Sequence, residues 1–200
     1  MDRLSTLSLA TLSLAVAVIA CGKTEPSGEP PPSRTDGAKV ATARGASTEA
    51  FCDVHASDAS GEPFHWPELA AGSTAPAAAH GWRWVNVWAT WCKPCIAEMP
   101  RLAAWRDKLA RAGTPVEMTF LSIDDSDAEV AAYRRDHADA PPAIRIAGNE
   151  QRTAWLRTLR LPDGAIPIHL FVSPANRLRC ARAGEVRDQD RPVVEKLFAE

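Results

Sequence analysis

The sequence predicts an α/β fold in which helices cover both faces of a mixed central sheet. From about residue 50 onward, segments rich in strand formers alternate with segments whose apolar residues repeat at three and four. Near the end of the chain, two such strands flank residues 173–177, whose Ser-Pro-Ala-Asn-Arg composition suits a hairpin turn. An amphipathic segment closes the chain. A strand–helix core that ends in a hairpin and a helix gives a mixed sheet with helices on both faces.

Strand and helix signals follow one another in the first half of this domain. Residues 50–54 suggest a leading strand, and residues 82–88 alternate with a period of two. Residues 93–112 form an expected helix, because apolar side chains repeat along one face. That face is made of Leu102, Trp105, Leu109 and Ala112.

The second half continues the alternation. Residues 116–123 form an expected strand, and Ser126 followed by Glu129 is a capping box that begins a helix ending near residue 137. A further helix fits residues 150–159. The last elements are strands over residues 166–172 and 178–183, then a helix that Asp190 is expected to cap.

The composition allows one globular domain with appendages. The chain has 200 residues, of which 46% are hydrophobic, close to the usual share for a globular protein. Its 23 basic and 25 acidic residues leave a formal net charge of −2. This balance indicates no nucleic-acid partner, which would need a basic surface.

The first 20 residues are expected to be a signal peptide. The uncharged apolar stretch over residues 4–19 is short for a membrane-spanning helix, which takes about 20 apolar residues. Small and aliphatic residues precede Cys21, which resembles a bacterial lipoprotein signal and makes Cys21 the expected lipidation site. An ordinary cleaved signal and an uncleaved anchor remain as alternatives.

The next segment, residues 21–49, is expected to be a flexible tether. It is rich in Pro, Gly, Ser, Thr and Ala and has almost no large apolar side chains, so it cannot bury enough surface to become ordered. The sequence therefore predicts an exported chain with a globular domain over residues 50–200. A lipid anchor would hold that domain at a membrane, facing the periplasm or the cell exterior.

Two cysteines at a predicted strand-to-helix junction are the strongest chemical signal. The segment reads Trp-Cys-Lys-Pro-Cys, and Cys92 falls at the expected start of the helix. Unpaired N–H groups and the helix dipole favour a thiolate there and lower the pKa of the Cys92 thiol. We therefore expect Cys92 to be the exposed nucleophile and Cys95, one turn further on, the resolving thiol. Zinc is the alternative, but a closed zinc site needs four ligands and no second pair follows.

Glu98 and Pro167 are further candidate catalytic residues. Glu98 shares a helical face with Cys95, where a carboxyl group could accept and return the proton of that cysteine. The alternative is a surface glutamate that favours the helix start electrostatically. Pro167 lies inside an apolar strand, where proline forfeits a ladder hydrogen bond, and a cis peptide bond would explain it.

Residues 85–100, Val-Asn-Val-Trp-Ala-Thr-Trp-Cys-Lys-Pro-Cys-Ile-Ala-Glu-Met-Pro, resemble the thioredoxin superfamily. More narrowly, they resemble the TlpA/ResA-like membrane-tethered thiol–disulfide oxidoreductases. The resemblance implies a thioredoxin fold over residues 50–200 and reduction of protein disulfides, as in cytochrome c maturation. It also implies a membrane electron donor and no cofactor.

The resemblance also implies particular residue roles. It makes Cys92 the nucleophile, Cys95 the resolving cysteine, Glu98 the acid beside the thiols, Pro100 a helix kink and Pro167 the cis-proline facing the disulfide. Ordinary thioredoxins have a buried aspartate at the place of Asn86, so proton handling would depend on Glu98 here.

Cys52 and Cys180 remain once the other three cysteines are assigned. In an oxidising compartment such a pair favours a structural disulfide, and two buried free thiols are the alternative. The five histidines show no metal-ligand spacing. His169 follows Pro167 closely enough to approach the thiols, and we expect it to be a core strand histidine.

Three functions are compatible with these residues. Dithiol–disulfide exchange is the leading one, and its direction, reductase or disulfide oxidant, is open because spacing does not set a reduction potential. Cu(I) handling by the soft thiolates of Cys92 and Cys95 is the second. A tethered binding module with incidental thiols is the third.

Overall fold

The computed structural model describes residues 47–77, 80–161 and 164–200. The expected signal peptide, Cys21 and the tether up to residue 46 therefore lie outside the described residues. Within those described ranges, no helix combines the length and apolar character needed to cross a bilayer.

A six-stranded mixed sheet forms the centre of the molecule, in the order β1-β6-β5-β2-β3-β4. Strands β2, β3 and β4 run parallel, and β5, β6 and β1 complete the sheet with antiparallel pairings. The prediction of an α/β fold with a mixed sheet is confirmed. The strands are β1 (Val54–His55), β2 (Trp82–Trp88), β3 (Val116–Ser122), β4 (Ala143–Arg145), β5 (Ile168–Val172) and β6 (Leu178–Ala183).

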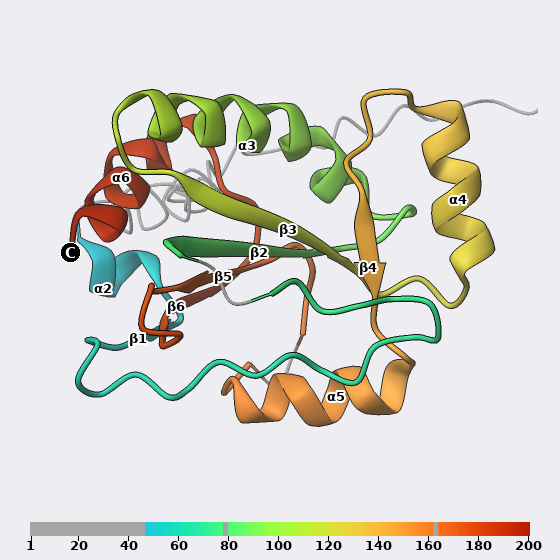
Figure 1. The fold of residues 1–200 in the computed structure, drawn as a ribbon, viewed down its shortest axis with the longest axis horizontal. Coiled ribbons are helices and arrows are strands. Elements are labelled where there is room, and N and C mark those ends of the chain that lie inside the picture. The colour runs from blue at the N-terminus through green and yellow to red at the C-terminus, as the bar shows by residue number, and fades with distance from the viewer. Residues whose placement is uncertain (1–46, 78–79, 162–163) are drawn as a thin grey trace, which may run out of the picture.

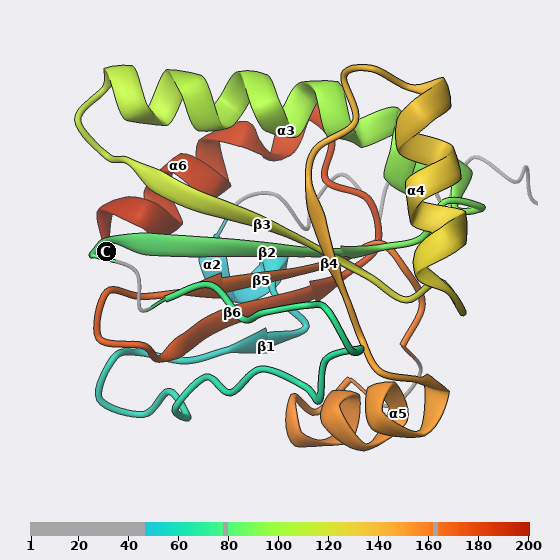
Figure 2. The same cartoon turned by 45° about the vertical axis from the view of Figure 1, so that its right-hand side comes forward.

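Helices cover both faces of this sheet. The long helix α3 and the closing helix α6 lie on one face and α5 lies on the other, while α4 stands beside the edge strand β4 (Figures 1 and 2). Two apolar clusters fill the spaces between these layers, one on each face. The helical segments are α2 (Thr48–Phe51), α3 (Lys93–Arg111), α4 (Asp127–Asp136), α5 (Asn149–Thr158), the 3-10 turn η2 (Asp188–Asp190) and α6 (Arg191–Ala199).

The central strand β2 is buried along its whole length. The period-two alternation in its sequence does not divide it into a buried and an exposed face, because all seven of its residues are buried. The reason is its position between β5 and β3 with helices above and below, which leaves neither face open to solvent. The polar side chains of Arg83 and Asn86 therefore lie inside the molecule and need partners there.

The predicted leading strand over residues 50–54 is wrong. The chain forms the short helix α2 instead, and the Ser47 hydroxyl caps it by accepting the Ala50 N–H at 3.2 Å. Phe51 then packs edge-on against Phe171 of β5, with ring centroids 6.0 Å apart. Pairing with β6 begins only at Val54.

Other boundaries differ by small amounts. The capping box of Ser126 and Glu129 is present at the start of α4, as predicted. Asp190 does precede α6, but its carboxylate accepts the Arg187 N–H at 2.8 Å and so caps η2. The three-residue strand β4 was not predicted, because its short run follows two prolines and carries no alternation.

Candidate active site

The two motif cysteines lie at the junction of β2 and α3 and are joined by a disulfide. Cys92 is the N-cap of α3, and its Sγ accepts the Cys95 N–H at 3.3 Å. Pro94 lies in the first turn of the helix, where a missing N–H removes no helical hydrogen bond. The local sequence thus aims one free N–H group of the first turn of α3, that of Cys95, at the sulfur of Cys92.

The two sulfurs are less accessible than the sequence suggested. Cys92 is 4% exposed and Cys95 is fully buried, so the expectation of an exposed Cys92 does not describe this oxidised state. The sulfur of Cys92 is bonded to Cys95 and lies over the first helical turn. Trp91, one residue earlier, is 63% exposed and marks the open side of the site.

A buried carboxylate fixes the turn that leads into Cys92. Asp124, just after β3, accepts hydrogen bonds from the Thr90 N–H at 3.1 Å and from the Thr90 hydroxyl at 2.7 Å. The Ser122 hydroxyl donates to the same carboxylate at 2.7 Å. This contact joins the ends of β2 and β3, and it was not predicted from the sequence. Polar residues after a parallel strand were the signal that could have found it.

Glu98 is fully buried on the face of α3 that carries Cys95. Its Oε1 accepts a hydrogen bond from Asn86 Nδ2 at 2.9 Å, and its Oε2 accepts one from the Val186 N–H at 3.0 Å. A buried polar group needs such partners, and these come from β2 and from the segment after β6. The interpretation of Glu98 as a surface glutamate is therefore wrong.

His169 on β5 lies beside the same carboxylate. Its Nε2 is 3.2 Å from Glu98 Oε1, a close contact that is poorly aligned for a hydrogen bond. On the other side of the ring, Trp84 Nε1 donates to His169 Nδ1 at 3.1 Å. His169 is fully buried, as expected of a strand histidine, and it also contacts the one carboxylate expected to handle protons.

Pro167 stands immediately before β5, and the Ile166–Pro167 peptide bond is cis. Its carbonyl oxygen accepts the Gly184 N–H at 2.7 Å, which ties the start of β5 to the end of β6. Pro100 lies inside α3, which continues without interruption through it.

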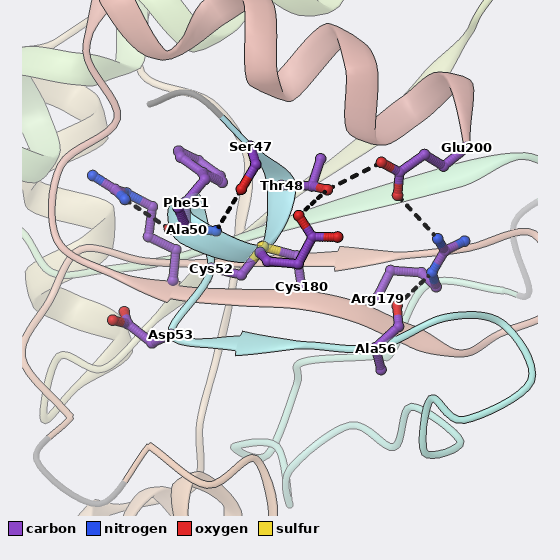
Figure 3. Close-up of a disulfide and its surroundings, with 12 residues drawn as sticks. Ser47, Thr48, Ala50, Phe51, Cys52, Asp53, Ala56, Arg179, Cys180 and Glu200 are labelled. Atoms are coloured by element: carbon purple, nitrogen blue, oxygen red, sulfur yellow. Dashed lines mark hydrogen bonds and ion pairs between the residues drawn. A yellow bond between two sulfur atoms is a disulfide. The ribbon is translucent and has the colours of Figure 1, made fainter. Parts of the chain in front are cut away.

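Cys52 and Cys180 form a second disulfide. Cys180 lies on β6, which β5 and β2 separate from β3 and β4 in the sheet. In Figure 3, Cys52 at the end of α2 reaches Cys180 on β6. Polar contacts surround this bridge. The Thr48 hydroxyl donates to Glu200 Oε1 at 3.0 Å, and Arg179 donates to the Ala56 carbonyl at 2.8 Å (Figure 3). The bridge therefore fastens the beginning of the domain to its end.

Two hollows flank the motif cysteines. One, of about 350 Å³, lies between Trp91 and the start of α5 and includes Asp124 and Arg152 in its lining. The other, of about 860 Å³ and largely apolar, runs along α3 from Ile96 to Arg106. Among residues 47–77, 80–161 and 164–200, no three His, Cys, Asp or Glu side chains are grouped so that they could hold a metal ion.

Comparisons with known proteins agree with this architecture. No family model matches the chain. The Bacillus subtilis (strain 168) protein named thioredoxin-like protein YneN is 39% identical to it over 49 residues. That match covers 24% of this chain and 29% of the relative, so it spans less than a third of the relative's length.

Two solved structures share the fold. A thioredoxin-related protein from Neisseria meningitidis serogroup B is 26% identical, with a TM-score of 0.52, and the match covers 66% of this chain and 98% of that one. A secreted thiol-disulfide isomerase from Corynebacterium glutamicum is 18% identical, with a TM-score of 0.55, over 74% of this chain and 92% of that one.

Proposed function

We propose that this chain is a thiol–disulfide oxidoreductase of the thioredoxin superfamily that works through Cys92 and Cys95. One observation carries the proposal. A Cys-x-x-Cys disulfide lies at the first turn of a 19-residue helix, and Cys92 is at the N-terminal end of that helix, which favours a thiolate. A dithiol that closes on itself in this place can exchange with another disulfide.

The exchange balances as follows in the reductive direction. The Cys92 thiolate attacks one sulfur of a protein disulfide, and the other substrate sulfur leaves and takes up a proton. Cys95 gives its proton to Glu98 and attacks Cys92, which breaks the mixed disulfide; the second substrate sulfur leaves and takes that proton from Glu98. The substrate has then gained two electrons and two protons, and the protein holds the Cys92–Cys95 disulfide.

The reductive direction is part of the proposal, with a membrane protein as electron donor and cytochrome c maturation as the process served. Its support is the resemblance of residues 85–100 to TlpA/ResA-like oxidoreductases. The same residues would run the reverse, oxidising reaction. The reduction potential distinguishes the two: a value as reducing as thioredoxin's supports a reductase, and one as oxidising as DsbA's makes the protein a disulfide oxidant.

Export and lipidation at Cys21 complete the proposal. Their support is the apolar stretch over residues 4–19, the small residues before Cys21 and the proline-rich segment after it. Fractionation of cells tests this part. We expect the native chain in the membrane fraction and the Cys21→Ala chain without its lipid; a Cys21→Ala chain that incorporates labelled lipid equally well would contradict the assignment.

Trapping tests the exchange reaction. A Cys95→Ala chain, expressed in its native compartment, should accumulate partner proteins as mixed disulfides that a reductant releases. The Cys92→Ala chain is the matched control and should trap nothing, because the buried Cys95 sulfur cannot begin the reaction. Equal trapping by both variants, or by neither, would remove the proposed function.

A further inference from the structure

Behind the cysteine pair, four buried side chains from three elements form what we call the Glu98 cluster: Trp84, Asn86, Glu98 and His169. Strands β2 and β5 place Asn86 and His169 directly opposite each other. Buried polar groups of this kind have few arrangements that satisfy all members at once. The hydrogen-bond roles of each group can therefore be worked out in turn.

The indole of Trp84 fixes the tautomer of His169. An indole N–H can only donate, so His169 Nδ1, 3.1 Å from Trp84 Nε1, must accept and carries no proton. The second donor near this atom is Asn86 Nδ2, at 3.5 Å. The neutral ring therefore has its proton on Nε2, the nitrogen that faces Glu98.

Several charged groups lie on the elements packed around His169, and Arg182 lies directly opposite it on β6. The charged groups on the elements packed around the cluster form ion pairs with one another: Arg182 with Asp190, Arg101 with Glu185 and Asp188, and Arg83 with Glu117. Among the described residues, His169 is the one basic side chain within ion-pair distance of Glu98.

The two carboxylate oxygens of Glu98 have different hydrogen-bond donors. Each carboxylate oxygen has two lone-pair directions. Oε1 accepts the Asn86 Nδ2–H at 2.9 Å and lies 3.2 Å from His169 Nε2, whose N–H is too poorly aligned for a hydrogen bond but brings its positive dipole end beside the carboxylate. Among the residues that the structure describes, the Val186 N–H, at 3.0 Å, is the one hydrogen-bond donor to Oε2, which keeps one direction free.

We propose that His169 is a positioning residue for proton transfer in the exchange reaction, an inference that rests on the function proposed above. Its Nε2–H, 3.2 Å from Oε1, places a positive dipole end beside the Glu98 carboxylate and favours the ionised form that takes the proton of Cys95. The Cys95–H bond breaks as the O–H bond of Glu98 forms, and the Cys95 thiolate attacks Cys92. The proton then passes from Glu98 to the departing substrate sulfur, so no oxidant or reductant beyond the substrate disulfide is required.

The test uses two substitutions at His169, each of which places a polar atom near one of the two imidazole nitrogens. His169→Gln places an amide N–H near the position of Nε2, and His169→Asn places an acceptor near Nδ1 but has no donor that reaches Glu98. The full chain is equilibrated with reduced and oxidised glutathione from pH 4 to pH 9, and the fraction of Cys92–Cys95 disulfide is measured. A plot of the equilibrium constant against pH bends where a group linked to the exchange takes up a proton.

We expect one bend to disappear in Glu98→Gln, which identifies it with the carboxyl group. That bend should move to higher pH by about one unit in His169→Asn, because the N–H dipole beside the carboxylate is lost, and should stay near its native position in His169→Gln. Trp84→Phe frees Nδ1 to hold the proton and should give the same upward shift. It keeps the test available if His169→Asn does not fold.

Phe171→Leu is the control for loss of packing, since Phe171 packs on Trp84 from the same strand as His169 and carries no polar group. A shift in Phe171→Leu as large as that in His169→Asn would reduce His169 to a structural residue and overturn the proposal. An unmoved bend in a folded His169→Asn chain would overturn it too. A native chain that does not exchange with glutathione at all would instead refute the proposed oxidoreductase function.

Discussion

The sulfur of Cys92 lies at the N-terminal end of α3, and the Cys95 N–H points at it from 3.3 Å. Lys93 is the next residue, and the first turn of α3 contains no acidic side chain. In the reduced protein each of these features stabilises the thiolate over the thiol. The pKa of the Cys92 thiol should therefore lie below that of free cysteine.

Alkylation of a reduced Cys95→Ala chain measures this ionisation. Near pH 6 the peptide that contains Cys92 should react with iodoacetamide about tenfold faster than free cysteine does at the same pH, because a larger fraction of Cys92 is ionised. Unfolding in urea is the control, because it removes the helix start and should lower the rate to that of free cysteine. A folded chain in which Cys92 reacts no faster than in urea would show that the helix does not activate this sulfur.

At this scale, short-range sequence signals identified the residues that one helix brings together. Cys92, Cys95 and Glu98 share the first turns of α3, so their spacing alone predicts their neighbourhood. The contacts of His169 could not be predicted in this way, because Trp84 and Glu98 lie far from it in the sequence. Strand register brings them together, and register depends on the whole sheet.

Among the elements, α4 is joined to the sheet by an ion pair. Arg145 Nε on β4 lies 2.7 Å from Asp127 Oδ1 in the first turn of α4. The hydrogen bond from this guanidinium lowers the pKa of the exposed Asp127 carboxyl below its ordinary value. The helix start favours the same ionised form.

The sign of the pH dependence follows from that lowered pKa. A depressed pKa in the folded state adds stability above the ordinary value, and this stability is lost as the pH falls through the folded value. Native protein should therefore exceed Asp127→Asn in melting temperature at neutral pH, and the difference should vanish in acid. An NMR titration should find the Asp127 midpoint below the ordinary value in native protein and closer to it in Arg145→Gln; equal midpoints would contradict the assignment.

The elements with strong periodicity were predicted correctly, and those that depend on distant partners were not. The pattern of Leu102, Trp105 and Leu109 predicted α3, and the capping box predicted α4. Residues 50–54 have strand-forming composition but fold as α2 and a turn. Packing of Phe51 on Phe171 and the bridge from Cys52 to Cys180 lie outside any local window, and both decide that segment.

Across the whole molecule, the two disulfides have opposite consequences for the chain. Cys52 and Cys180 are 128 residues apart in sequence, whereas Cys92 and Cys95 are separated by 3. A cross-link stabilises mainly by restricting the unfolded chain, and the restriction grows with the length of the closed loop. The long bridge therefore suits a structural role, and the short one can open and close at little cost to the fold.

Replacing each pair by alanine compares the two bridges within one chain. Chain-entropy arguments give a loss of unfolding free energy of about 5 kcal/mol for Cys52→Ala with Cys180→Ala, against about 2 kcal/mol for Cys92→Ala with Cys95→Ala. Urea unfolding under oxidising conditions measures both values. The long-bridge variant should also retain the native reduction potential at Cys92 and Cys95, because its bridge lies between β6 and the end of α2, away from α3.

Partial compensation in the long-bridge variant is expected from the polar contacts beside it. Thr48 and Arg179 both bind Glu200, and Arg182 binds the Phe51 carbonyl at 2.8 Å, so the beginning of the domain stays attached to β6 and α6 without the bridge. Adding Glu200→Gln should therefore destabilise the long-bridge variant more than it destabilises the native chain. If the two bridges proved equal in stabilisation, loop length would not govern their roles, and the assignment of Cys52 and Cys180 to structure alone would be lost.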